Sequence, residues 1–301
     1  MNMISTPDLI DALQSPTPAV LLHVLPQESW EAQHIPTSRC FCVYETSFLA
    51  NVVASYPDAA TDIVVYGMGL PMLESSVAAE KLRAAGYLNV RNYRDGITGW
   101  MQENLPVNGT ALIADTPPIE GTWQIDTDQS IIRWTGRNLF NFHHGTLKLS
   151  GGYFMIGDNA LTQSSFTIDM TSITCDDILD QATNQMLLNH LMNSDFFAAD
   201  QFPEAIFTAI SITAIPQENP GIPNYRVVGD LSMRGVTQPI AFPALIALSD
   251  EGTLTAQAQI EIDRTHWGVN YGSGRLFSWL DKHVVNDHVA IHLKIVARRT
   301  V

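Results

Sequence analysis

The side chains of this chain that are best suited to nucleophilic or metal chemistry are three cysteines and nine histidines. Cys40 and Cys42 form a C-x-C pair in the segment RCFCVYE, whereas Cys175 stands alone. A C-x-C pair with no second pair nearby is weak evidence for zinc, and unpaired cysteines are commonly small buried hydrophobic residues. We therefore interpret Cys40 and Cys42 as core residues. The alternative is a relocated reactive thiol or a two-sulfur metal site.

Most of the histidines lie in the C-terminal part of the chain, at His143, His144, His190, His266, His283, His288 and His292. Neighbouring side chains of a strand point to opposite faces, so the adjacent pair at 143–144 is expected to direct its rings apart. We predict no metal site from these residues. Asp263–Arg264 and Asp281–Lys282 are interpreted as salt-bridged turn residues rather than catalytic groups.

The segment VVYGMGLPMLESS, residues 64–76, has the pattern of a strand, a loop and a helix, which is typical of catalytic or anion-binding sites, but its loop carries no reactive side chain. Val64, Val65 and Tyr66 are typical of a buried strand, and the glycines and proline that follow end it. A tight loop between a strand and a helix is where α/β proteins often place a nucleophile or bind an anion. This loop contains no Cys, Arg or Lys.

The segments around this loop alternate between strand and helix patterns. AVLLHVL (19–25), DIVVYG (62–67) and NVRNYR (89–94) are short and apolar, as buried strands are, whereas LESSVAAEKLRAAGY (73–87) is typical of a helix that ends at a glycine. Strands that alternate with helices of this size predict a small parallel-sheet α/β domain over residues 1–109.

This first domain resembles a rhodanese domain along nearly its full length. The resemblance is carried by LLHVLPQESWEAQHIPTS, IVVYG and AAEKLRAAGYLNVRNYRDGITGWMQENLPV, with the HIP of His34–Pro36 and the Gly96, Trp100, Leu105–Pro106 ending as specific signals. In active rhodaneses the residue after the VVY-type strand is a cysteine that carries a persulfide. Gly67 stands at that position here.

Other positions of the rhodanese pattern have also changed. The family's usual Asp and Arg of the first strand are His23 and Leu25, and apolar residues replace the arginines that bind the anionic substrate. A glycine offers no nucleophile, so the resemblance predicts an inactive module without catalytic residues. The apolar loop residues are Met68, Leu70, Met72 and Leu73. We interpret them as a docking surface for a protein partner or for the second domain. The alternative is a loop that only covers its own domain.

Residues 110–120 read as a linker, because Pro117–Pro118 and two nearby glycines interrupt every periodic pattern. From residue 121 to 301 the pattern changes to a period of two. LTAQAQIEID, VAIHLKIVARR and SSFTIDMTSI alternate apolar and polar residues, as strands of antiparallel sheets and barrels do. We predict an antiparallel β-barrel of about eight strands, which is lipocalin-like in size, with one or two helices. DDILDQATNQMLLNHLM (176–192) is the expected helix, and its opening Asp is a cap signal.

The second domain resembles the YceI-like family over about 120–301. The resemblance is carried by TWQIDTDQSIIRWTGRNLF, LMNSDFFAADQFPEAIFT, YRVVGDLSMRGVTQPIAFP and EIDRTHWGVNYGSG. It implies a barrel similar to polyisoprenoid-binding proteins, with a ligand such as an isoprenoid quinone, a polyprenyl chain or a fatty-acid-type lipid, and no required cofactor. Alternation alone does not separate a hollow barrel from a filled one. The expected ligand-binding residues are Phe142, Phe154, Phe166, Ile168, Met170, Leu187, Phe207, Met233, Trp267, Tyr271 and Trp279.

Composition narrows the classes of partner. The formal net charge of −15 argues against nucleic acid and against an anionic membrane surface, since both attract basic patches. No stretch is apolar enough for a membrane-spanning segment, and the N-terminus lacks the pattern of a secretory signal. Together with three cysteines that form no disulfide framework, this predicts a cytoplasmic protein. The sequence leaves the oligomeric state open, and a homodimer is one of the alternatives.

The sequence therefore supports three functional hypotheses. The first is a non-enzymatic lipid-binding barrel joined to an inactive rhodanese-like module. The second is a sulfurtransferase that uses Cys40 or Cys42. The third is an interaction protein whose barrel is filled by side chains.

Overall fold

The computed structural model describes residues 2–110, 120–158, 160–217, 219–249, 252–280 and 283–300. Contacts divide the chain into two compact units, Met1–Asp115 and Thr116–Val301. Most of the predicted linker over 110–120 and the predicted Asp281–Lys282 turn pair lie outside the described residues. The domain limits 1–109 and 121–301 stay predictions.

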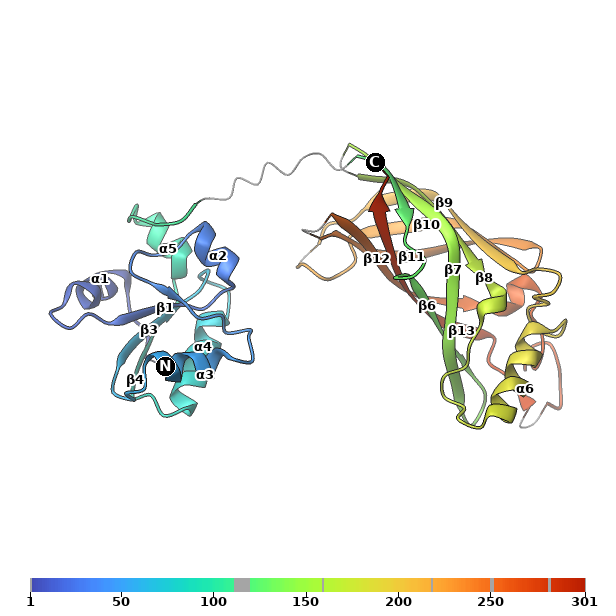
Figure 1. Cartoon of the computed structure of the whole chain (residues 1–301), viewed down its shortest axis with the longest axis horizontal. Coiled ribbons are helices and arrows are strands. Elements are labelled where there is room, and N and C mark those ends of the chain that lie inside the picture. The colour runs from blue at the N-terminus through green and yellow to red at the C-terminus, as the bar shows by residue number, and fades with distance from the viewer. Residues whose placement is uncertain are drawn as a thin grey trace. The chain divides into compact units, whose positions relative to one another are not determined.

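The first unit is an α/β layer structure, as the alternating pattern predicted (Figure 1). Its elements are α1 (Thr6–Gln14), β1 (Val20–His23), α2 (Gln27–Ala32), β2 (Arg39–Cys40), α3 (Phe48–Ser55), β3 (Asp62–Tyr66), α4 (Glu74–Ala84), β4 (Asn89–Tyr93) and α5 (Gly96–Gln102). The strands form one parallel sheet in the order β2-β1-β3-β4.

The central strand β3 is apolar on both faces because helices cover both sides of the sheet. Ile63 and Val65 belong to one hydrophobic cluster, whereas Val64 and Tyr66 belong to another. This burial explains the uninterrupted apolar run in the sequence. The loop that follows β3 therefore starts from a rigid element.

The second unit is a closed antiparallel barrel (Figure 1). Its strands are β5 (Gly121–Ile125), β6 (Ile131–Arg137), β7 (Phe142–Gly157), β8 (Ala160–Asp169), β9 (Glu204–Ala214), β10 (Tyr225–Met233), β11 (Val236–Leu248), β12 (Thr253–Asp263) and β13 (His288–Arg299). Each strand from β7 to β13 pairs with the next, and β13 pairs with both β5 and β6. Since β5 and β6 also both pair with β7, they share one position and the barrel closes with eight positions.

The helical elements of this unit include one α-helix, α6 (Gln181–Met192), and two short 3₁₀ helices, η1 (Met170–Ser172) and η2 (Arg264–Trp267). The expected helix start at Asp176 was wrong. The cap is Asp180, whose carboxylate accepts the Thr183 backbone N–H at 2.8 Å. The residues before Asp180 instead run along the edge of the barrel, because their backbone bonds to β7. The Asp176 N–H donates to the His144 carbonyl at 2.8 Å. Within the described segments, the structure contains no helix long and apolar enough to cross a membrane.

Candidate functional site

The interior of the barrel contains a cavity of about 300 Å³ that is lined mainly by apolar side chains. Every strand from β6 to β13 contributes to the lining, and α6 adds Leu187, His190 and Leu191. The period-two alternation of the strands creates this surface, because each strand turns its apolar residues inward. The volume lies at the lower end of the range of small-molecule sites, about 300–1,000 Å³.

A layer of aromatic rings forms one end of the cavity. The ring centroids of Phe166 and Phe207 lie 5.1 Å apart, and those of Phe207 and Phe242 lie 5.5 Å apart. The same three rings also border a second, much smaller space of about 30 Å³. The barrel is therefore hollow on one side of this layer and closely packed on the other.

The other end of the cavity is built from α6 and the segment that follows η2. The His190 ring lies edge-on to the rings of Phe196 and Tyr271, with centroid distances of 5.0 and 4.4 Å. The Tyr271 side chain is partly exposed, so an amphipathic ring borders both the cavity and solvent. Asn138 and Asn286 also line the cavity, and Asn286 lies beside Arg264 at this end.

Arg264 is the charged group buried most deeply in this wall, with 2% of the residue exposed. Its guanidinium donates to the backbone carbonyls of Asn286 (3.0 Å), Val269 (2.5 Å), Tyr271 (2.8 Å) and Val285 (3.1 Å). These donors are committed to the protein backbone, so Arg264 shapes the segment around the cavity rather than presenting a charge to a ligand.

Asp263 and Arg264, which were predicted to be salt-bridged turn residues, each form an ion pair in the structure. Asp263 bonds to Thr265 at the start of η2 and pairs with Arg275 at 2.9 Å, whereas Arg264 lies 3.7 Å from Asp287. Both residues are structural charges, but each has another partner. The reason is that η2 turns the two successive side chains in different directions.

The cavity brings together seven of the predicted ligand-binding residues, namely Phe166, Ile168, Met170, Leu187, Phe207, Met233 and Tyr271. The other four lie elsewhere. Phe154 borders the small space beyond the aromatic layer. Trp267 is buried and donates its indole N–H to the Leu231 carbonyl at 2.8 Å. Phe142 and Trp279 are 53% and 99% exposed and do not contact the cavity.

Sequence reasoning missed other lining residues. Ile132 and Trp134 line the cavity from β6, and their period-two spacing would have identified them. His190 lies three residues after Leu187, so both occupy the same face of α6. Asn138 and Asn286 carried no such signal, since they come from irregular segments.

The prediction that the rings of His143 and His144 point apart was wrong. Both Nδ1 atoms approach Asp177, at 2.8 Å from Oδ2 and 3.7 Å from Oδ1 respectively. The segment of Asp177 bonds to the backbone of β7, since the Asp176 N–H donates to the His144 carbonyl, and this brings the Asp177 carboxylate close to both rings. Burial alone would raise the pKa of Asp177, but bonds from the His144 backbone, the His143 ring and the Cys175 thiol outweigh it and lower the pKa to about 2.

In the first unit, the position of the rhodanese nucleophile is filled by a carboxylate. Glu74, the first residue of α4, is 7% exposed, and its Oε1 accepts the Met68 backbone N–H at 2.7 Å. A Cβ atom added to Gly67 would overlap Glu74 Cγ and lie only 2.6 Å from Oε1. Gly67 and Glu74 are therefore matched, because the carboxylate occupies the space that a side chain at residue 67 would need.

The four apolar loop residues project outward. Met68, Leu70, Met72 and Leu73 are 46–63% exposed. The loop backbone is held against α5, because the N–H groups of Ile97 and Thr98 donate to the carbonyls of Gly67 and Met68, each at 3.0 Å. The loop is thus fixed by its backbone, and its four apolar side chains remain about half exposed.

The remaining reactive side chains of this unit are in unreactive surroundings. Burial, with smaller contributions from Cys42 and nearby carboxylates, raises the pKa of Cys40 to about 11. Cys42 is buried. Neither cysteine belongs to a metal-binding cluster within the described residues. His23 is fully buried with no hydrogen-bond partner on either ring nitrogen, and burial together with nearby His34 lowers its pKa to about 4.

The fold and the cavity define a two-domain protein, in which a parallel α/β unit precedes an antiparallel barrel with an apolar interior. Residues 123–297 match the family model described as YceI-like domain, and residues 5–103 match the one described as Rhodanese-like domain. The first match covers more than half of the chain, so this chain belongs to the YceI-like family.

Several known proteins are similar to the YceI-like part. A UPF0312 protein of Pseudomonas putida is 26% identical over 139 residues, which are 45% of this chain and 67% of that protein. The crystal structure of BcnA from Burkholderia cenocepacia has 23% identity and a TM-score of 0.45, covering 57% of this chain and 98% of its own. A polyisoprenoid binding domain from Saccharophagus degradans has 12% identity and a TM-score of 0.42, covering 59% and 98%.

Proposed function

We propose that the barrel binds a hydrophobic chain in its cavity and that the rhodanese-like unit is a non-catalytic docking or regulatory module. The observation that carries the first part is the apolar cavity of about 300 Å³, to which all strands from β6 to β13 contribute. Burial of a ligand chain contributes about 0.8 kcal/mol for each CH₂ group. No catalytic group is needed for such binding.

The ligand class that fits best is a chain with a small polar head. Most of the wall is apolar, while Asn138, Asn286 and Tyr271 gather at one end. A polyprenyl chain, an isoprenoid quinone or a fatty-acid-type lipid has this distribution of polarity. The resemblance to polyisoprenoid-binding proteins makes isoprenoids the first class to test.

The non-catalytic role of the first unit rests on Gly67 and Glu74. The loop position that would carry a persulfide has no nucleophile, and a carboxylate fills its space. Cys40 is a poor substitute, because its pKa of about 11 keeps the thiol protonated near neutral pH. A sulfur-transfer assay of the full chain, with Cys40→Ser and Cys42→Ser as controls, tests this part. Turnover that depends on either cysteine would favour a sulfurtransferase.

The exposed loop residues Met68, Leu70, Met72 and Leu73 support a docking role. Flexible methionine side chains suit a surface that adapts to a partner. The three free thiols of the chain fit a reducing, cytoplasmic location.

The decisive experiment for the barrel is native mass spectrometry of the gently purified full-length protein. Wild type should carry a bound mass that organic solvent releases. Ile168→Trp should lose this mass, because Ile168 lines the cavity and a larger ring would occupy the space of the ligand. Ile210→Trp is the matched control, because Ile210 is 66% exposed on β9 and does not line the cavity. If the Ile168 variant is folded and retains as much lipid as wild type, the cavity is not the binding site.

A further inference from the structure

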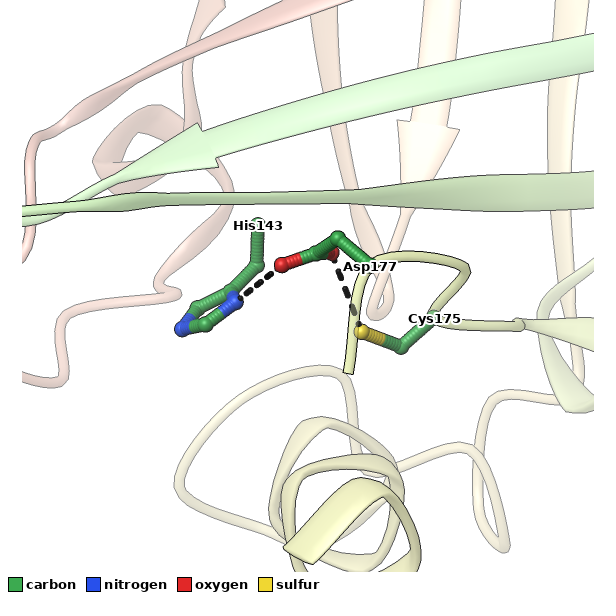
Figure 2. Close-up of side chains that lie close together, drawn as sticks. All are labelled: His143, Cys175 and Asp177. Atoms are coloured by element: carbon green, nitrogen blue, oxygen red, sulfur yellow. Dashed lines mark hydrogen bonds and ion pairs between the residues drawn. The ribbon is translucent and has the colours of Figure 1, made fainter. Parts of the chain in front are cut away.

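A nitrogen, a sulfur and an oxygen donor converge at the edge of the barrel. They belong to His143 on β7 and to Cys175 and Asp177, which lie between η1 and α6. Figure 2 shows the Asp177 carboxylate between the imidazole and the thiol. Its Oδ2 accepts from His143 Nδ1 at 2.8 Å, and its Oδ1 accepts from Cys175 Sγ at 3.4 Å. One ligand atom from each residue lies within 4.8 Å of the other two.

The backbone holds this cluster in place. The Thr174 N–H donates to the Thr146 carbonyl at 2.9 Å, and the Trp134 indole N–H donates to the Thr174 carbonyl at 3.1 Å. Gly145 is required at this crossing, because a Cβ there would overlap the Thr174 carbonyl oxygen. From the helix side, Asn184 donates to the Cys175 carbonyl at 2.7 Å. The side chains are therefore positioned before any ligand arrives.

The arrangement does not suit a nucleophilic triad. In such a triad the imidazole lies between the nucleophile and the carboxylate, so that it can take the proton of the nucleophile. Here the carboxylate lies between the other two groups and hydrogen-bonds to both. A thiol that donates to a carboxylate is not activated by it. The cluster instead presents the three kinds of donor that zinc accepts in proteins.

From this geometry we infer that His143, Cys175 and Asp177 bind a divalent transition-metal ion of the zinc type. The ion takes the place of the two shared hydrogen bonds. It bonds to the thiolate, one carboxylate oxygen and Nδ1 of the neutral imidazole, and the thiol proton is released to solvent. In a tetrahedral zinc site the donor atoms lie about 3.3–3.6 Å apart. The distance of 3.4 Å between Cys175 Sγ and Asp177 Oδ1 already matches this value, whereas His143 Nδ1 and Asp177 Oδ2, at 2.8 Å, must separate slightly.

The remaining coordination position has two chemical outcomes. His144 Nδ1 lies 3.7 Å from Asp177 Oδ1, so a ring rotation would bring a fourth protein ligand to the ion. Otherwise the position takes water. His143 also lines the barrel cavity, so an ion at this place would connect the wall of the ligand site to the segment that leads into α6.

Cobalt(II) titration of the metal-free full-length protein tests the site, because a cobalt ion bound by a thiolate gives a charge-transfer absorption in the near ultraviolet. We expect one equivalent of cobalt per chain, with a band that zinc abolishes by displacement. Cys175→Ser should remove the band, whereas Cys42→Ser should retain it. His143→Gln should weaken cobalt binding by at least about 100-fold, since loss of outer hydrogen-bond partners alone costs 10–100-fold.

Stability gives a second readout that does not depend on the cysteine variant folding well. Zinc should raise the unfolding temperature of the wild-type barrel, and a chelator should reverse this shift. His143→Gln should lose the shift while keeping a wild-type circular dichroism spectrum. The inference is wrong if cobalt gives no thiolate band in wild type, or if the band persists in Cys175→Ser. Either result would mean that the hydrogen bonds of His143 and Cys175 to Asp177 only hold the Asp177 segment against β7.

Discussion

Replacement of Gly67 by cysteine should fail to create a sulfurtransferase, and the structure gives a steric reason in addition to the missing arginines. The backbone of Gly67 is not in the left-handed region, so a side chain is allowed there by its dihedral angles. The obstacle is Glu74. The new Cβ would lie 2.6 Å from Oε1 and 2.8 Å from Cδ of Glu74, so the carboxylate must move.

The cost of this movement follows from what Glu74 does. Its buried carboxylate accepts the Met68 N–H at 2.7 Å, and hydrogen bonds to charged groups contribute about 1.5–3 kcal/mol. We expect Gly67→Cys to lower the free energy of unfolding of this domain by about that amount. Glu74→Ala should have a similar cost, because it leaves the Met68 N–H without a partner. The double variant should cost less than the sum, since the overlap is gone.

Two measurements check this reasoning in the full chain, namely chemical unfolding of the four proteins and sulfur transfer from thiosulfate to cyanide. The expected result is a positive coupling between the two positions and no turnover in any protein, because the loop from Met68 to Ser76 contains no Arg or Lys that could stabilise a thiolate. Strictly additive stability changes would show that Glu74 does not occupy the nucleophile position. Turnover by Gly67→Cys at the rate of an active rhodanese would refute the conclusion that this loop cannot support sulfur transfer.

Three other perturbations test different parts of the structure. The free energy of unfolding should decrease by about 3 kcal/mol as the pH falls from 6.5 toward 4. The reason is His23, whose pKa is 6.5 in the unfolded chain and about 4 in the folded protein. Over this pH range the unfolded chain therefore binds a proton that the folded protein does not. A His23→Gln variant measured by urea unfolding should show a flatter pH dependence. Phe207→Ala should cost about 3–5 kcal/mol and join the two spaces on either side of the aromatic layer, so native mass spectrometry should detect longer bound chains. Met68→Asp with Leu70→Asp should leave stability nearly unchanged but alter assembly state or lipid exchange, whereas Leu88→Asp, a control at a more exposed leucine outside the loop, should alter neither.

Each of these has an outcome that contradicts it. If the free energy of unfolding of His23→Gln depended on pH as that of wild type does, a group other than His23 would be responsible for the pH dependence. A Phe207 variant with wild-type stability would mean that the aromatic layer does not separate the two spaces. Loop variants that lose stability without any change in assembly or exchange would reduce the loop to a cover for its own domain.

The alternation of the strands allowed much of the barrel to be predicted. Phe166, Ile168 and Met170 occupy one face of their strand in the sequence, and all three line the cavity. The same alternation does not direct Phe142 or Trp279 into the cavity. Phe142 starts β7, and Trp279 lies in an irregular segment outside any strand, so neither is directed inward by a strand pattern.

Contacts between segments far apart in the chain were beyond sequence reasoning. His143 and Asp177 are 34 residues apart, and no spacing rule relates a strand residue to a crossing loop. Glu74 was visible only as an acidic residue in the first turn of a helix, which is common near the positive end of the helix dipole. Its inward rotamer depends on the absence of a side chain at Gly67, a pairwise fact that neither residue indicates by itself.

Active rhodaneses have a cysteine where this chain has Gly67, and this difference changes which group the loop backbone binds. The loop and the start of α4 present backbone N–H groups, and such groups favour a negative charge. In an active rhodanese the thiolate or its persulfide supplies that charge. In this chain the Glu74 carboxylate supplies it and bonds to the Met68 N–H. The hydrogen bond from Met68 to the Glu74 side chain therefore supports the shape of the loop from within the chain. Because Glu74 is part of the fold, this support needs no bound ligand, and it holds the loop from which the exposed side chains of Met68, Leu70 and Met72 project.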